Sequence, residues 1–210
     1  MPQATIACVG DSLTAGISGA YNELNPLTYQ YWTSRCLIDT KGLYEPGDLY
    51  FRNFGVPGAV MSQILRQLDL FYKAEWVIIM GGTNDFWMFS HATNQEQNRE
   101  CVSDVVNKLN RAITKAKSME IQNVALCTIP PVKVNPVAPE HIHRNILLAN
   151  EKIKKISGQL NVHLVDVHAA MSAKDGEMIP ENCQEDGVHF TESGNRSCGY
   201  AIAKVIAEVN

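Results

Sequence analysis

The sequence predicts an α/β fold in which helices cover both faces of a parallel sheet. Three observations support this prediction. Five short apolar runs alternate with segments of helical periodicity along the 210 residues, which is the pattern of parallel sheets built from βα units. No internal repeat, low-complexity tract or linker divides the chain, so residues 1–210 are expected to form one domain. Glycine-containing polar motifs follow the strands, at the end where such sheets bind ligands.

The expected strands are short apolar runs, with lengths typical of strands buried on both faces. In chain order they are 5–9, 49–54, 76–80, 123–129 and 162–167.

The expected helices show apolar residues at spacings of three and four. Ile64, Leu65, Leu68 and Phe71 share one side of a helix in 60–72, and the apolar residues of 95–119 also lie on one face. The complete set is a helix within 25–41, then 60–72, 95–119, 140–160 and 191–209.

Composition excludes several classes of partner. The net charge is −4 and no cluster of Lys and Arg stands out, so neither nucleic acid nor an anionic membrane surface is an expected partner. No apolar run approaches the roughly 20 residues that span a bilayer, so no integral membrane segment is expected. The first residues lack a charged leader and an apolar signal core. A cytoplasmic location is therefore expected, with a mature secreted form as the alternative.

The six cysteines indicate neither a zinc site nor a redox site, because no two form a Cys-x-x-Cys pair. Cys8 and Cys127 lie in apolar strands and are expected to be small buried residues. The even count permits a disulfide, such as one between Cys183 and Cys198. In a chain of this size without a signal peptide, free thiols are expected instead.

Four polar motifs follow the strands. They are GDSLTAG (10–16), NFGVPGA (53–59), GGTND (81–85) and, at a distance after the fifth strand, DGVHFT (186–191). Because parallel strands end at one edge of the sheet, these motifs are expected to converge there. Together they provide a hydroxyl, an imidazole, a carboxylate, a side-chain amide and backbone N–H donors next to glycine.

This set of groups is suited to acyl transfer. A serine hydroxyl attacks an ester only when a histidine accepts its proton, and a carboxylate must fix the tautomer of that histidine. The tetrahedral intermediate also needs hydrogen-bond donors aimed at its oxyanion.

The four motifs resemble, in order, the sequence blocks of the SGNH hydrolase superfamily, and the chain looks like a GDSL esterase/lipase. The resemblance implies a three-layer α/β/α fold, with a flavodoxin-like five-stranded parallel sheet of order 2-1-3-4-5. It implies Ser12 as the nucleophile and Asp186 and His189 as the other members of a catalytic triad. It further implies that the oxyanion hole consists of the backbone N–H groups of Ser12 and Gly58 and the side-chain amide of Asn84.

The second motif contains a proline, which leaves Gly55 as an alternative to Gly58 in the oxyanion hole. Gly58 is favoured because it lies nearer the start of the following helix, where free N–H groups concentrate. Asp11 is expected to stabilise its own turn, Asp85 to cap a helix, and Thr191 to cap the last helix.

Two pairs of residues offer alternative sites. Asp166 and His168 share one face of the fifth strand and could form a rival catalytic pair, but they lack the context of the motifs. His141 and His143 could bind a metal, but no further ligands stand at a supporting spacing, so no metal is expected.

The roles of three further segments remain open from the sequence. The aromatic segment 86–89 either belongs to the core or lines the substrate site. The loop 19–27 and the proline-rich loop 128–141 are candidate lids from their positions, because loops after strands commonly carry function.

The leading hypothesis is a serine ester hydrolase without metal or cofactor that forms an acyl-enzyme intermediate. Its expected substrate is a small-molecule ester with a small or single-chain acyl group, because the compact chain lacks a large apolar lid helix. Within the same family, a carbohydrate O-deacetylase or a lysophospholipase is an alternative. Two alternatives are not hydrolases: a flavodoxin-like phosphate- or nucleotide-binding domain, and a non-catalytic member of the family. The sequence does not indicate the oligomeric state.

Overall fold

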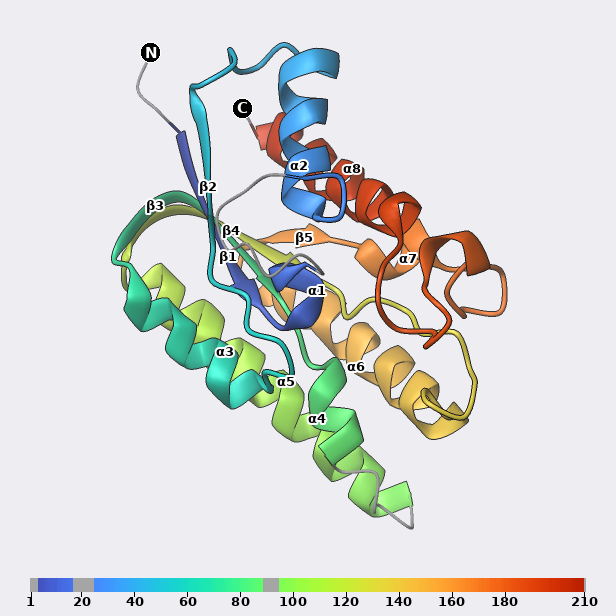
Figure 1. The fold of residues 1–210 in the computed structure, drawn as a ribbon. Coiled ribbons are helices and arrows are strands. Elements are labelled where there is room, and N and C mark those ends of the chain that lie inside the picture. The colour runs from blue at the N-terminus through green and yellow to red at the C-terminus, as the bar shows by residue number, and fades with distance from the viewer. Residues whose placement is uncertain (1–3, 17–24, 89–94, 210) are drawn as a thin grey trace.

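The computed structural model describes residues 4–16, 25–88 and 95–209 of the chain. At its centre lies a parallel sheet (Figure 1). Its strands are β1 (Ala4–Gly10), β2 (Leu49–Asn53), β3 (Lys73–Met80), β4 (Glu120–Cys127) and β5 (His163–Val165). The five strands lie in the order β2-β1-β3-β4-β5, and every neighbouring pair is parallel. The α/β class and the strand order implied by the family resemblance are therefore confirmed.

Helices lie between the strands in sequence, and two more come after the last strand. They are α1 (Ser12–Ala15), α2 (Tyr29–Arg35), α3 (Met61–Gln67), α4 (Thr83–Met88), α5 (Gln95–Lys117), α6 (Glu140–Gln159), α7 (Val167–Met171) and α8 (Glu192–Val209). A π-helical turn at Cys36–Thr40 extends α2, and 3₁₀ turns lie at Leu68–Leu70 and Pro180–Asn182.

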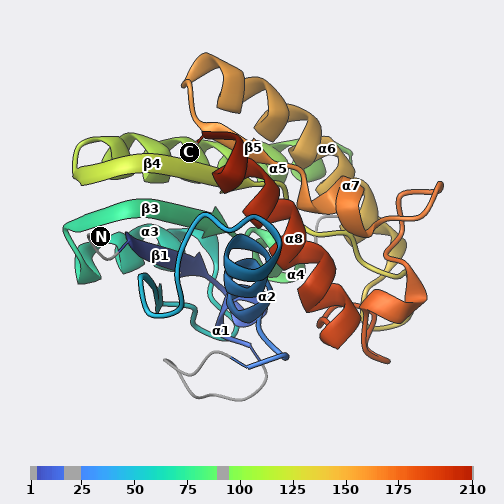
Figure 2. The same ribbon diagram turned by 90° about the horizontal axis from the view of Figure 1, so that it is seen from above.

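The two faces of the sheet carry separate apolar cores, because successive strand side chains point to opposite sides. On β3, Val77 and Ile79 face the core formed with α3, α5 and α6. Trp76 and Ile78 face the core formed with α2, α7 and α8. Figure 2 shows α2 and α8 side by side on this second face. Three layers result, with the sheet in the middle.

Several boundaries differ from those expected, and the largest differences among the strands are at β3, β4 and β5. β3 and β4 each begin three residues early, because exposed polar residues, Lys73 in β3 and Glu120 and Gln122 in β4, interrupt the apolar run there. β5 has only three residues, because the Asp166 side chain accepts a hydrogen bond from the N–H of Ala169 and caps α7. The expected strand 162–167 therefore ends where this short helix begins.

The cysteines are all free and buried, including Cys183 and Cys198. The disulfide that the even count permitted is absent, and the expected free thiols are confirmed. Burial raises the pKa of the Cys8 thiol to about 12, so this thiol stays protonated and behaves as a small apolar side chain. No helix in the described part of the chain has the length and apolar character needed to cross a bilayer.

Candidate active site

Ser12 lies at the turn between β1 and α1, as the first residue of the short helix. The helix cap is its neighbour Asp11, whose Oδ1 accepts a hydrogen bond from the N–H of Leu13 at 2.9 Å. Asp11 therefore stabilises the turn, as expected, and the hydroxyl of Ser12 is not used for capping. Asp11 is buried, and burial raises the pKa of its carboxyl to about 6.

The end of β1 is held by a buried glutamine. The N–H of Gly10 donates to Oε1 of Gln67 at 2.7 Å, and Nε2 of Gln67 donates to the carbonyl of Gly10 at 2.8 Å. Gly10 has no room for a side chain, because a Cβ would lie 2.5 Å from the carbonyl oxygen of Met80. These contacts fix the backbone immediately before Asp11 and Ser12.

His189 and Asp186 reach Ser12 from the loop before α8. The His189 Nε2 atom lies 3.0 Å from the Ser12 hydroxyl oxygen, and its Nδ1 atom lies 2.6 Å from Oδ2 of Asp186. The structure therefore brings together three residues that stand 177 positions apart at their extremes. Thr191 ends the loop, and its Oγ1 accepts from the N–H of Gly194 as the expected cap of α8.

The carboxylate of Asp186 is oriented by its own loop. Its Oδ1 accepts hydrogen bonds from the N–H groups of Val188 at 2.8 Å and His189 at 2.9 Å. Partial burial acts to raise the pKa of Asp186, but the His189 side chain and these two N–H groups outweigh it and lower that pKa. Asp186 is therefore ionised at neutral pH, and a carboxylate next to Nδ1 favours the neutral tautomer of His189 in which Nδ1 is the donor and Nε2 the acceptor.

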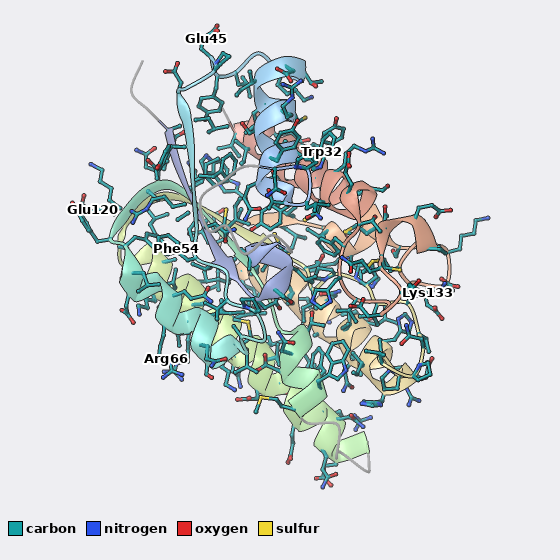
Figure 3. All side chains as sticks on the ribbon, viewed as in Figure 1. Trp32, Glu45, Phe54, Arg66, Glu120 and Lys133 are labelled. Atoms are coloured by element: carbon teal, nitrogen blue, oxygen red, sulfur yellow. The ribbon has the colours of Figure 1, made fainter. Side chains whose placement is uncertain are left out.

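The proline-rich loop supports this segment from outside. The N–H of Lys133, labelled in Figure 3, donates to the carbonyl of Gly187 at 2.8 Å. Gly187 has a φ of 75°, and a Cβ there would lie 2.5 Å from both Asn135 Nδ2 and the Lys133 carbonyl oxygen. Only glycine fits at position 187, directly after Asp186, in this conformation.

Asn84 faces the same site from the first turn of α4. Its Nδ2 donates to the carbonyl of Ala59 at 3.0 Å, which leaves the second amide hydrogen available. Ala59 follows Gly58, which has a φ of 75° in the turn before α3. The hydrogen bond therefore joins Asn84 to the Gly58 turn.

Gly55, the alternative to Gly58 in the oxyanion hole, already uses its N–H group in a hydrogen bond. The N–H of Gly55 donates to Oδ1 of Asn53 at 2.9 Å, and the residue packs against the backbone of Ala15. The N–H of Gly58 has no hydrogen-bond partner within the described part of the chain. Gly58 is thus the glycine of this motif with a free donor.

Asp85 caps a helix, but a different one from its own. Its Oδ2 accepts from the N–H of Met61, the first residue of α3, at 2.8 Å. It also lies 3.9 Å from Nζ of Lys108. Asp85 therefore joins α4 to α3 and α5 and stiffens the base of the segment that carries Asn84.

A pocket of about 250 Å³ opens beside these groups. Ser12, Asn84 and His189 supply its polar wall, together with Asp11, Thr83 and Asp186, and the apolar wall consists of Leu13, Trp87, Val137 and Val188. The aromatic segment thus divides: Phe86 is buried in the core, Trp87 lines the pocket, and Met88 is 69% exposed. Phe89 and most of the loop 19–27 lie outside the described residues.

The two alternative sites, Asp166 with His168 and His141 with His143, do not have the contacts that their proposed roles require. Asp166 caps α7 and pairs with Nζ of Lys154 at 2.6 Å, and it makes no hydrogen bond with the ring of His168. The Nε2 atom of His168 is buried without a partner in the described ranges, so it is not poised on a nucleophile. Near His141 and His143, as elsewhere in residues 4–16, 25–88 and 95–209, no group of three His, Cys, Asp or Glu side chains could hold a metal ion.

Two features of the site gave little sequence signal. Gln67 is a polar residue on the buried side of a helix. This position is the only sequence signal that its side chain forms hydrogen bonds with the backbone of another segment. The N–H of the Trp87 ring donates to the carbonyl of Val137 at 2.8 Å. A tryptophan after the GGTND motif indicated either core or substrate site, but not this link to the proline-rich loop.

The parallel α/β sheet and the groups at its carboxyl edge define the class of serine ester hydrolases. Residues 8–197 match the GDSL-like lipase/acylhydrolase family. The chain belongs to this family, as the four motifs indicated. A search among curated protein sequences found no match.

Two solved structures match the fold at low sequence identity. Axe2, an acetylxylan esterase from Geobacillus stearothermophilus, shares 19% identity with a TM-score of 0.76, and the match covers 98% of this chain and 94% of Axe2. LAE5, an α/β hydrolase enzyme from the metagenome of Lake Arreo in Spain, shares 19% identity with a TM-score of 0.69, over 100% of this chain and 97% of LAE5. At this identity the likeness shows the shared fold.

Proposed function

We propose that the chain hydrolyses small esters through an acyl-enzyme formed on Ser12, with His189 as the general base and Asp186 as its orienting carboxylate. The observation that carries the proposal is the pair of hydrogen bonds in series, 3.0 Å from Ser12 Oγ to His189 Nε2 and 2.6 Å from His189 Nδ1 to Asp186 Oδ2. The first distance is within the range in which a base can take the serine proton, and the second is within the range in which a carboxylate can orient that base.

In the first half-reaction, the Ser12 oxygen attacks the ester carbonyl while its proton moves to Nε2 of His189. The tetrahedral intermediate collapses when His189 gives this proton to the leaving alcohol. In the second half-reaction, His189 takes a proton from water, the resulting hydroxide attacks the acyl carbon, and Ser12 leaves with the proton restored. Asp186 stays ionised throughout and stabilises the imidazolium form.

The oxyanion is proposed to accept hydrogen bonds from the N–H groups of Ser12 and Gly58 and from Nδ2 of Asn84. The link between Asn84 and Ala59 supports this assignment, because it ties the side-chain donor to the turn that carries Gly58. Preorganised donors of this kind each contribute about 10²–10³ in rate.

The size of the pocket favours a small substrate group. Its volume of about 250 Å³ is below the range of about 300–1,000 Å³ usual for drug-sized ligands. A long lysophospholipid chain therefore exceeds the space next to Ser12. A phosphate- or nucleotide-binding role would leave the series of hydrogen bonds at Ser12 without a purpose.

An acetylated carbohydrate is the second candidate substrate, because an acetyl group suits so small a pocket. The likeness to Axe2, an acetylxylan esterase, supports testing it. Catalytic mutants of Axe2 replace a serine, an aspartate and a histidine by alanine, with the aspartate three positions before the histidine. Asp186 and His189 have the same spacing.

The test is hydrolysis of p-nitrophenyl acetate and of acetylated xylo-oligosaccharides by the wild type and by Ser12→Ala and His189→Ala variants. We expect each variant to lose at least about 10³-fold in kcat while keeping the melting temperature of the wild type. Ser118→Ala, an exposed serine at the end of α5, is the matched control and should keep full activity. Near-native hydrolysis by pure Ser12→Ala protein would refute the proposal.

A further inference from the structure

We infer that Trp87 limits the length of the acyl chain that this enzyme accepts. The inference rests on the ester hydrolysis proposed above and names the residue that sets the acyl specificity of that site. It follows from three features: the place of Trp87 on α4, its hydrogen bond to the proline-rich loop, and the rigidity of that loop.

Trp87 lies one helical turn after Asn84 on α4. Residues three apart share a face of a helix, and both side chains line the pocket beside Ser12. Its neighbours cannot serve the same purpose, because Phe86 is fully buried in the core and Met88 is 69% exposed. Among the described residues of this segment, 86–88, Trp87 is therefore the aromatic residue that lines the pocket.

The indole is joined to the proline-rich loop within the apolar wall of the pocket. Its Nε1 donates to the carbonyl of Val137 at 2.8 Å, across 50 residues of sequence. Val137 also lines the pocket. Figure 1 shows α4 beside α6, whose start follows the Val137 segment directly. Helix and loop thus form one continuous apolar surface instead of two walls that can part.

The loop that carries Val137 is held in a tight turn. Oδ1 of Asn135 accepts from the N–H groups of Val137 at 2.8 Å and Ala138 at 2.9 Å. The N–H of Asn135 donates to the carbonyl of Ala138, whose side chain is buried in the core. Since the turn is internally bonded and anchored, the Val137 carbonyl is a fixed acceptor that keeps the indole in place.

The apolar wall that contains Trp87 and Val137 is placed to contact the acyl group of the substrate and not its alcohol. The alcohol leaves beside His189, which must protonate it, and the side chains of His189 and Asp186 are 38% and 33% exposed. The alcohol side is thus partly exposed to solvent. The Trp87 wall lies on the side of Asn84, the proposed oxyanion donor, so the chain attached to the carbonyl carbon meets the indole.

The experiment compares kcat/KM for p-nitrophenyl acetate, butyrate, hexanoate and octanoate in the wild type and in Trp87→Ala and Trp87→Phe. We expect the wild type to favour acetate. Trp87→Ala should raise kcat/KM for hexanoate at least tenfold relative to acetate, and Trp87→Phe should shift it less in the same direction. Met88→Ala, on the same helix but outside the pocket, is the matched control and should keep the wild-type profile.

The outcomes separate this inference from the proposed function. If the wild type hydrolyses acetate in a Ser12-dependent way but Trp87→Ala and Trp87→Phe keep its chain-length profile, the inference is wrong and the function stands. A wild type that prefers octanoate, or a Trp87→Ala variant whose preference changes with the alcohol at fixed acetyl instead of with the acyl chain, would also overturn it. Trp87→Phe keeps the test decisive if the alanine variant fails to fold.

Discussion

Replacement of Asp186 by asparagine should disable His189 without removing a side chain from the site. Oδ1 of Asp186 accepts two backbone N–H groups, whereas Oδ2 faces Nδ1 of His189. An asparagine must place its oxygen at the Oδ1 position, because an NH₂ group there would face two donors. Its NH₂ group then faces Nδ1, which becomes an acceptor. The histidine proton moves to Nε2, and that atom can no longer accept the proton of Ser12.

The size of the effect follows from the loss of the base. In a triad, the wrong histidine tautomer lowers kcat by about 10⁴, which corresponds to about 5.5 kcal/mol in the activation free energy. The two backbone hydrogen bonds to the side chain persist in the variant, so we expect the loop to keep its conformation and the protein to stay folded.

The assay is kcat for p-nitrophenyl acetate between pH 6 and 8, with the melting temperature measured in parallel. Asp175→Asn is the control, because Oδ1 of Asp175 also accepts a backbone hydrogen bond, from Glu177, but lies outside the pocket. The control should stay within about twofold of the wild type. An Asp186→Asn variant that keeps more than a tenth of wild-type kcat would refute the reasoning.

Three further changes test other parts of the site. Asn84→Ala should lower kcat for p-nitrophenyl acetate by about 10²–10³ through loss of an oxyanion donor; an unchanged kcat would remove Asn84 from the oxyanion hole. Gly187→Ala forces a side chain into a left-handed position and against Lys133, so urea unfolding should show a loss of about 1–3 kcal/mol, and equal stability would contradict the close packing. Burial raises the pKa of Asp11 to about 6, so the folded state keeps a proton that the unfolded chain releases near pH 4. The contribution of Asp11 to stability therefore falls between about pH 4 and 6, and the unfolding free energy of Asp11→Asn relative to wild type should rise over that interval by on the order of 3 kcal/mol; a constant difference would contradict the raised pKa.

The sequence predicted those parts of the site that lie in local motifs. Ser12 and Asn84 each stand in a short segment whose glycines and polar residues mark a turn after a strand, and Asp186 and His189 stand in a similar segment before the last helix. A parallel sheet gathers such turns at one edge, so the order of apolar runs was enough to place them near one another. The order of the strands was available only through the family resemblance.

Contacts between distant segments could not be predicted in the same way. Gln67 bonds Gly10 across 57 residues, Trp87 bonds Val137 across 50, and Asp85 bonds the start of α3 across 24. Each depends on how two elements pack, and periodicity describes one element at a time. The fifth strand was predicted, but its early end was not, because Asp166 begins a helix with its side chain, which competes with extension of the strand.

The measurement that tests the central claim most directly is labelling by a fluorophosphonate, which reacts with activated serines, followed by mass spectrometry of the digested protein. We predict a single adduct on the peptide that carries Ser12, formed quickly in the wild type and at least about 10³-fold more slowly in His189→Ala. An adduct on another serine, or labelling of Ser12 at the same rate without His189, would contradict the account.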